Sequence, residues 1–366
     1  MVSEIRETLP GAAYHSAETY AVDTERVFYR NWVYVGRAER VPKPGSWIRV
    51  EVADESILVV RGKDDRIRAF YNVCRHRGSR LCEEPQGEVR THLRCPYHAW
   101  GYALDGTLVT TPMIEKEEID RPSTSLWPVH VDVWEGFVFV NLSREEPQPL
   151  LDHLADQLDE PLHLARFGLG ELRIGHMTSI EVQANWKIVI ENYNECLHCP
   201  TVHPELVSVV PAYKKGWILE DGRDDGGVSL ADGRTTVALD PRLRLPLLPG
   251  VTEGETQAYY GALVYPTMFL DVDGSACLAT AVFPTGPQSC LLVTEYLFSP
   301  EAVADPDFDP TPVVEFNELV IRQDNDACER VQRGVTSRAF DHGVFPEKDS
   351  WVYEFDQRYL RDVETP

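Results

Sequence analysis

Two short cysteine–histidine pairs are the most chemically specific feature of the sequence. Cys74 and His76 are separated by one residue, Cys95 and His98 by two, and 18 residues lie between the pairs. Two such loops can hold one centre from opposite sides, and Pro96 helps to fix the second loop. Two thiolates and two imidazoles suit either a tetrahedral zinc ion or a two-iron cluster in which one iron is bound by cysteine and the other by histidine.

A second group of ligand-type residues lies in the segment NWKIVIENYNECLHCPTVHPEL, residues 185–206. Its apolar spacing predicts a helix over residues 185–198, which would place Glu195 and His198 on one face. Pro200 is expected to end this helix, so that His203 returns from the following loop.

Two other interpretations of this segment remain open from its residues alone. A solvated polar stripe of Glu191, Asn192, Glu195 and His198 could lie opposite an apolar face. Alternatively, Cys196 and Cys199 could bind zinc, although no second cysteine pair follows them.

A carboxylate far along the chain favours a metal site. The pattern predicts a long helix over residues 311–338. Five apolar residues lie three, four or seven positions from Asp324: Val320, Ile321, Ala327, Cys328 and Val331. Asp324 is therefore expected in the buried stripe, where an ionised carboxylate is costly unless it is paired or binds a metal. Asp326 has polar neighbours and is expected to be solvated. His198, His203 and Asp324 would form a 2-His-1-carboxylate triad, which leaves positions open for oxygen on a non-haem Fe(II).

The elements that must position these residues fall into two regions. A helix is expected over residues 16–33, and β-rich runs from Tyr34 to Leu142 predict a small all-β domain. A Leu-rich helix interrupted at Pro161 connects this domain to a second region. That region begins with a strand at 176–183 and the segment 185–206. Further strands, the long helix and a final strand at 351–355 follow. Residues 220–235 predict a mobile acidic loop. This is an α+β layout in which a sheet packs on the long helix.

Composition limits the classes of protein to which the chain can belong. The chain has 366 residues, and 43% of them are hydrophobic, which makes disorder unfavourable. Its formal charge of −24 makes binding to nucleic acid or anionic membranes unfavourable. No apolar run is long enough to cross a bilayer and no signal peptide is evident, so a cytoplasmic location is expected. Eight cysteines in such a chain predict core residues, ligands or reactive thiols rather than a disulfide framework.

With both constellations in this order, and with CPYHAWGY at the second loop, the chain resembles the catalytic α subunit of Rieske non-haem iron oxygenases, the aromatic-ring-hydroxylating dioxygenase superfamily. The resemblance implies an α+β fold: an N-terminal helical segment (1–36), an all-β Rieske [2Fe-2S] domain (37–148), and a helix-grip (START-like) catalytic domain (149–366) with an antiparallel sheet around a long C-terminal helix. It implies a [2Fe-2S] cluster on Cys74, His76, Cys95 and His98. It also implies a mononuclear Fe(II) on His198, His203 and Asp324.

The resemblance further implies a homotrimer in which Glu195 bridges His198 to His98 across subunits. Aromatic-ring dioxygenases usually carry Asp at this bridge. The Glu, together with the surrounding ENYNECLHCPTVHP, is closer to the branch that oxidises choline, carnitine, glycine betaine or proline betaine. O2 is the expected co-substrate. Electrons from NAD(P)H are expected through a separate flavin/[2Fe-2S] reductase or ferredoxin, because the chain has no Gly-rich dinucleotide motif.

The expected reaction is hydroxylation of a substrate C–H bond, leading to N-demethylation of a quaternary ammonium compound. Hydroxylation of an aromatic acid and a non-enzymatic Rieske electron carrier are the alternatives. A quaternary ammonium group needs an aromatic cage, for which Tyr259, Tyr260, Tyr265 and Phe269 are candidates, although strand aromatics more often belong to the core.

Overall fold

The computed structural model of the chain describes residues 6–157, 159–216 and 226–364. The chain divides into two compact units, a smaller unit of residues 28–152 and a larger unit made of the residues before Phe28 and after Asp152. The N-terminal stretch through Val27 thus belongs to the larger unit. The first part of the acidic loop expected at 220–235 lies outside the described residues.

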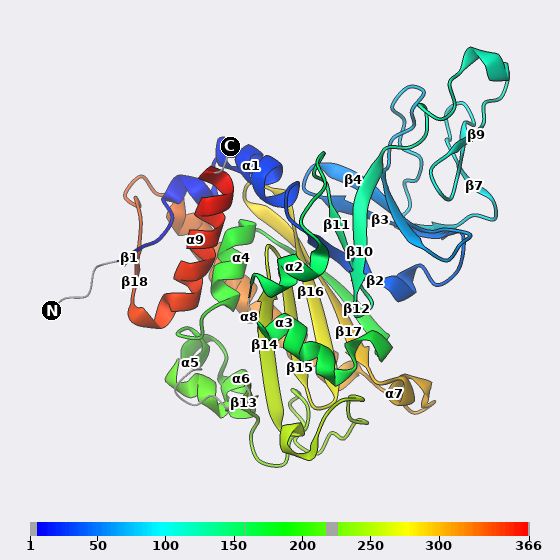
Figure 1. The fold of residues 1–366 in the computed structure, drawn as a ribbon. Helices are drawn as coiled ribbons and strands as arrows, with labels where there is room; N and C mark the ends of the chain where they lie inside the picture. The colour runs from blue at the N-terminus through cyan, green and yellow to red at the C-terminus, as the bar shows by residue number, and fades with distance from the viewer. Residues whose placement is uncertain (1–5, 158, 217–225, 365–366) are drawn as a thin grey trace. The chain divides into compact units, whose positions relative to one another are not determined.

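The smaller unit is all-β, as expected (Figure 1). Its main sheet has seven strands, and each pair of neighbouring strands is antiparallel. The order is β2 (Val33–Arg37), β11 (Phe137–Asn141), β10 (Pro128–Trp134), β5 (Ile67–Tyr71), β4 (Glu55–Arg61), β3 (Ser46–Val52) and β6 (Gln86–Glu88). A second sheet contains β7 (His92–Arg94), β8 (Gly101–Ala103) and β9 (Leu108–Thr110). Both cysteine–histidine loops lie next to strands of these sheets, because the first follows β5 and the second joins β7 to β8.

The larger unit is built on a six-stranded antiparallel sheet. Its order is β12 (Arg173–Val182), β17 (Ser289–Phe298), β16 (Ala276–Gly286), β15 (Met268–Asp273), β14 (Ala258–Val264) and β13 (Val228–Ser229). The long helix α8 (Thr311–Val335) packs against this sheet, with Val313 and Val314 in one core cluster with Tyr296 and Phe298. This sheet around a long helix is the predicted catalytic fold, and the α+β fold class is confirmed.

Several shorter helices complete the larger unit. Helix α4 (Trp186–Tyr193) contacts α8, β16 and α9 (Ser350–Glu364). Three helices precede α4 in the chain: α1 (Ala17–Asp23), α2 (Leu150–Ala155) and α3 (Asp159–Leu164). Helix α1 continues as a π-helix over Thr24–Phe28. Helix α2 contains the residue at which the two units divide. After α4 come α5 (Cys199–Val202), α6 (Pro204–Val209) and α7 (Pro300–Ala304). Strands β1 (Arg6–Glu7) and β18 (Val344–Phe345) form a separate pair.

Three secondary-structure predictions outside the segment 185–206 need correction. The strand expected at 351–355 is part of the helix α9, whose buried residues Val352, Phe355 and Tyr359 follow helical spacing. Pro161 does not interrupt a helix; it lies in the first turn of α3, where its missing N–H has no helical partner to lose. The first helix begins after Ser16, whose side chain accepts from the Thr19 N–H, but its helical turns end at Phe28 rather than at residue 33.

Candidate metal centres

The two cysteine–histidine loops of the smaller unit are closed in the same way. In each loop the cysteine N–H donates to the carbonyl five residues on, and the N–H four residues on donates to the cysteine carbonyl, at 2.8–3.1 Å. The residues four positions after Cys74 and Cys95 are Gly78 and Ala99, with φ of 76° and 58°. Each loop therefore turns back through a left-handed residue, and the two loops share one backbone geometry.

The four predicted cluster ligands converge between these loops. The imidazole rings of His76 and His98 have centroids 4.6 Å apart. Cys74 and Cys95 are each 2% exposed, and the two thiols are close enough to shift each other's pKa. Tyr102 Oη lies 3.3 Å from Cys74 Sγ. The two histidines are thus brought together across the loops, and so are the two cysteines.

The surroundings of these side chains fit a metal cluster. His76 Nδ1 and His98 Nδ1 are buried and have no hydrogen-bond partner among the described residues, which is costly unless the nitrogen binds a metal. Burial raises the pKa of the Cys74 thiol. At Cys95 burial acts in the same direction, but N–H donors from Tyr97 and His98 outweigh it and lower the pKa. Free imidazole nitrogens opposite stabilised sulfurs are what a mixed cysteine–histidine [2Fe-2S] cluster requires.

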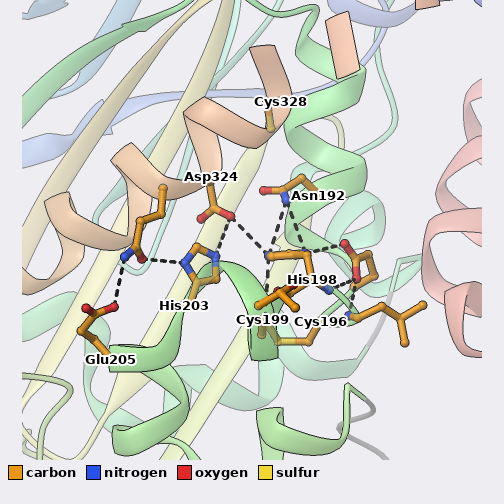
Figure 2. Close-up of polar contacts among 12 residues, drawn as sticks. Asn192, Cys196, His198, Cys199, His203, Glu205, Asp324 and Cys328 are labelled. Atoms are coloured by element: carbon orange, nitrogen blue, oxygen red, sulfur yellow. Dashed lines mark hydrogen bonds and ion pairs between the residues drawn. A yellow bond between two sulfur atoms is a disulfide. The ribbon is translucent and has the colours of Figure 1, made fainter. Parts of the chain in front are cut away.

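In the larger unit, three separate segments bring His198, His203 and Asp324 together (Figure 2). One ligand atom from each lies within 4.8 Å of the others. Asp324 Oδ1 is 2.8 Å from His203 Nε2 and 3.3 Å from His198 Nε2. His198 directly precedes α5, His203 lies between α5 and α6, and Asp324 comes from α8. Two Nε2 atoms and one carboxylate directed at a common point form a donor set that suits Fe(II).

A glutamine that was not singled out in the sequence orients one of these histidines. His203 Nδ1 lies 2.8 Å from Gln323 Oε1, and Gln323 Nε2 donates to Glu205 Oε2 at 3.0 Å. Because the Gln323 oxygen can only accept, His203 Nδ1 carries a hydrogen, and Nε2 is the nitrogen that would offer its lone pair to a metal. The adjacency of Gln323 to Asp324 in the sequence was the only signal for this role.

Glu195 lies in a turn and does not share a helix face with His198. Helix α4 ends at Tyr193, earlier than predicted, and Pro200 lies in the first turn of α5 instead of ending a helix. The Glu195 carboxylate accepts hydrogen bonds from the Leu197 and His198 N–H groups, which competes with continued helix. Its other oxygen contacts His198 Nδ1. The predicted Glu195–His198 pairing is therefore made by side-chain contact across a turn.

The charges around the three-residue group favour a bound cation. Burial lowers the pKa of His198, but hydrogen bonds to Asp324 and Glu195 outweigh it and raise that pKa to about 9. Burial likewise raises the pKa of Asp324, and its bonds to His198 and His203 bring it below the usual range. The two carboxylates thus stabilise positive charge between them, and a divalent metal would supply it.

The two other interpretations of the segment 185–206, a solvated polar stripe and a zinc site, can now be judged. Cys196 and Cys199 form a disulfide, so their sulfurs are not available as zinc ligands. The sequence predicted core residues, ligands or reactive thiols rather than a disulfide framework, and this one pair departs from that prediction. Glu191 is not part of a solvated stripe. It accepts from Tyr14 Oη at 2.8 Å, and its pKa is raised well above the usual value, chiefly by burial. Asp326 is exposed, as predicted.

A cavity of about 170 Å³ opens beside the three-residue group. Of the four predicted cage residues, Tyr259 and Phe269 line it. Tyr260 instead contacts Phe167, and Tyr265 bonds to Asp362. Tyr193, Tyr213 and Asp271 are among the wall residues that the sequence interpretation missed. The available signal was Asp271 itself, a charged residue between the apolar Leu270 and Val272 in the strand MFLDVD.

Comparison with known proteins matches both halves of the chain. Residues 31–130 match the Rieske [2Fe-2S] domain, and residues 169–365 match the catalytic domain of the ring-hydroxylating alpha subunit. The chain therefore belongs to the ring-hydroxylating alpha-subunit family of Rieske oxygenases.

Relatives within the family are enzymes named for quaternary ammonium substrates. The glycine betaine monooxygenase oxygenase subunit of Chromohalobacter salexigens is 31% identical, over 95% of this chain and 83% of the relative. The carnitine monooxygenase oxygenase subunit of Acinetobacter pittii is 28% identical, over 92% of this chain and 87% of the relative. A solved quaternary ammonium Rieske monooxygenase, studied for carnitine oxidation and inter-subunit electron transfer, is 25% identical, with a TM-score of 0.79 over 98% of this chain and 95% of that one.

Membership of this family settles several of the sequence predictions. The protein is an oxidoreductase, the terminal oxygenase component of a Rieske system. It uses a Rieske [2Fe-2S] cluster, a mononuclear iron and O2, and it acts on a small molecule with electrons from a separate reductase. The interpretation as a non-enzymatic electron carrier is wrong. In the described part of the chain no helix is long and apolar enough to span a membrane.

Proposed function

We propose that this oxygenase hydroxylates an N-methyl group of a small quaternary ammonium compound. The observation that carries the proposal is the aromatic cavity that adjoins the His198–His203–Asp324 group. Aromatic faces attract a cation that cannot donate a hydrogen bond, as a quaternary ammonium group cannot. The names of the relatives, glycine betaine and carnitine monooxygenases, agree with this class of substrate.

In this proposal Cys74, His76, Cys95 and His98 hold the cluster, and His198, His203 and Asp324 hold the iron. The cluster supplies electrons one at a time, and the iron supplies a site for O2 activation. We assign the cluster to residues 37–148 and the iron to residues 149–366. A cytoplasmic location is inferred, because a reductase that draws on NAD(P)H works there.

The chain's own residues orient this machinery. Gln323 keeps the hydrogen of His203 on Nδ1, so that Nε2 faces the metal position. Glu195 does the same for His198 through its Nδ1 contact. In a homotrimer, Glu195 would also contact His98 of the partner subunit, and the two imidazoles would then share one carboxylate as an electron path.

The overall reaction balances with reductant from the partner protein. An N-methyl ammonium, O2, two electrons and two protons give the N-hydroxymethyl ammonium and water. The N-hydroxymethyl ammonium then loses its C–N bond and a proton, releasing formaldehyde and a tertiary amine. Formaldehyde therefore distinguishes this reaction from ring hydroxylation of an aromatic acid, which yields none.

The test is a coupled assay of the iron-loaded enzyme with a Rieske-oxygenase reductase and NADH, screening quaternary amines and aromatic acids. We expect formaldehyde to form in step with oxygen uptake for a quaternary amine. In the Asp324→Ala variant turnover should fall by at least about 100-fold, because a ligand of the iron is lost, while the visible spectrum of the cluster stays unchanged. Hydroxylated aromatic product without formaldehyde would contradict the proposed substrate class, and full activity of Asp324→Ala would contradict the proposed iron ligands.

A further inference from the structure

A buried carboxylate forms part of the wall of the cavity. Asp271 lies on β15, and its Oδ1 accepts hydrogen bonds from Tyr193 Oη at 2.7 Å and from Tyr259 Oη at 2.6 Å. Two tyrosines from different elements, one at the end of α4 and the other on β14, thus hold one carboxylate oxygen. Gly261 leaves room for them, since a Cβ there would lie 3.2 Å from Tyr193 Oη and 3.4 Å from Asp271 Oδ1.

Aromatic rings surround this carboxylate. The Tyr193 ring stacks on Phe269 with centroids 3.8 Å apart and planes 8° from parallel. The Tyr213 ring lies nearly perpendicular to Tyr259, with centroids 6.4 Å apart. All four rings line the cavity together with Asp271. Aromatic faces around a carboxylate are the environment in which a desolvated organic cation is stabilised.

The neighbouring Asp273 shows what a purely structural carboxylate looks like in this sheet. Asp273 accepts from the Thr236 hydroxyl and from the N–H groups of Val237, Ser275 and Ala276, so both of its oxygens are bonded. Among the described residues, hydrogen bonds to Asp271 reach its Oδ1 atom and not its Oδ2 atom. Asp271 is also less buried than Asp273. Its second oxygen is therefore left for a ligand in the cavity.

The electrostatics of the wall point to a ligand of positive net charge. Four carboxylates line the cavity, those of Glu195, Asp271, Asp273 and Asp324, and the basic groups in the described wall are the two imidazoles of the metal group. A bound metal balances the carboxylates next to it, but Asp271 stays uncompensated. A ligand carboxylate placed in this cavity would be repelled by Asp271, whereas an ammonium group would be attracted.

We propose that Asp271, with Tyr193, Tyr259, Tyr213 and Phe269, forms a cation-binding subsite that selects substrates with a positive ammonium group and a neutral remainder over zwitterionic betaines. Choline represents the first class and glycine betaine the second. This inference rests on the proposed oxidation of a quaternary ammonium compound. It separates this protein from the relatives named for glycine betaine and carnitine, which are both zwitterions.

The experiment measures binding to the iron-loaded holoenzyme by calorimetry. The probes are choline, glycine betaine and 3,3-dimethyl-1-butanol, the uncharged analogue of choline. In the wild type we expect choline to bind at least about tenfold more tightly than either of the others. In Asp271→Asn, which keeps the shape of the side chain, we expect choline to lose that advantage while the affinity for the neutral analogue changes less than about twofold. Glu301→Gln on the exposed end of α7 removes one negative charge outside the cavity and should leave all three affinities unchanged.

The outcomes separate the subsite from the wider proposal. If glycine betaine binds more tightly than choline, or if Asp271→Asn weakens choline and its neutral analogue equally, the subsite is overturned while oxidation of quaternary amines still stands. If no amine binds and an aromatic acid is turned over, the proposed function itself fails. The measured quantity is the ratio of affinities of one variant for two ligands. Partial loss of folded protein affects both affinities alike, so it does not change this ratio. Tyr193→Phe and Tyr259→Phe, which keep the rings and free the Oδ1 atom, should retain the preference for choline.

Discussion

At the scale of single residues, Glu195 has the most specific proposed role. One carboxylate oxygen contacts His198 Nδ1, the other accepts from the N–H groups that follow it, and the side chain is only 18% exposed. Glutamine keeps the size of this side chain but removes its charge. It can accept from His198, but it cannot accept through both terminal atoms, so one of the two proposed histidine contacts must weaken.

We therefore expect Glu195→Gln to slow transfer of electrons from cluster to iron by about 10-fold or more, with both metals retained. Rapid-mixing single-turnover experiments on the pre-reduced enzyme, following reoxidation of the cluster, measure this rate, and metal analysis tests retention. Glu318→Gln, which removes a charge from α8 at a pair with Arg322, is the control and should reoxidise like the wild type. Wild-type reoxidation in Glu195→Gln would show that the carboxylate is not part of the electron path.

At the scale of elements, the turn between α4 and α5 carries both Glu195 and His198, and the Cys196–Cys199 disulfide spans it. The two cysteines belong to a core cluster with Val209, Val210 and Phe316, so the turn is anchored to α6 and α8 as well. Closing so short a loop removes about 2 kcal/mol of chain entropy from the unfolded state. The disulfide therefore stabilises the element that places His198.

A phosphine reductant should lower the melting temperature of the wild type by roughly 4–8 °C, the shift that about 2 kcal/mol gives in a domain of this size. Differential scanning calorimetry with and without the reductant measures the shift. The double variant Cys196→Ala, Cys199→Ala is the control, because it should start lower and show no such response. An unchanged wild-type melting temperature, with free thiols verified by alkylation, would show that the disulfide does not stabilise the fold.

At the scale of the whole molecule, buried carboxyl groups make stability depend on pH. Burial raises the pKa of Asp356 to about 7 and the pKa values of Asp271 and Asp273 to about 6. In the unfolded chain these groups lose their protons near pH 4, so between about pH 4 and 7 the folded state binds more protons. Stability therefore falls as pH rises through this window, and the net charge of −24 acts in the same direction.

From pH 6 to pH 8 we expect a loss of about 2 kcal/mol, or roughly 5 °C in the melting temperature of the holoenzyme. Asp356→Asn should make this dependence shallower, because it removes the group with the highest pKa of the three. Thermal melts at constant ionic strength give both slopes. A wild-type melting temperature that rises from pH 6 to pH 8 would contradict the raised pKa values of these carboxyl groups in the folded state.

The sequence alone determined the class of chemistry and most of the candidate ligands. Few residue types bind iron, and within each loop their spacing is local, so Cys74, His76, Cys95 and His98 stand out without a structure. Asp324 could be added because helical periodicity shows which face of α8 is apolar. The two-part α+β fold followed from the same patterns, since strand and helix periods differ.

Only the tertiary structure decided what surrounds those ligands. Gln323 and Asp271 meet His203, Tyr193 and Tyr259 through side chains that are distant in the sequence, and no local period encodes such contacts. The short pattern at 351–355 is ambiguous between strand and helix, and packing against α4 decides for helix. Ligand types and periodicity are local properties of the chain, whereas the orientation of a ligand and the shape of a cavity depend on which distant side chains pack together.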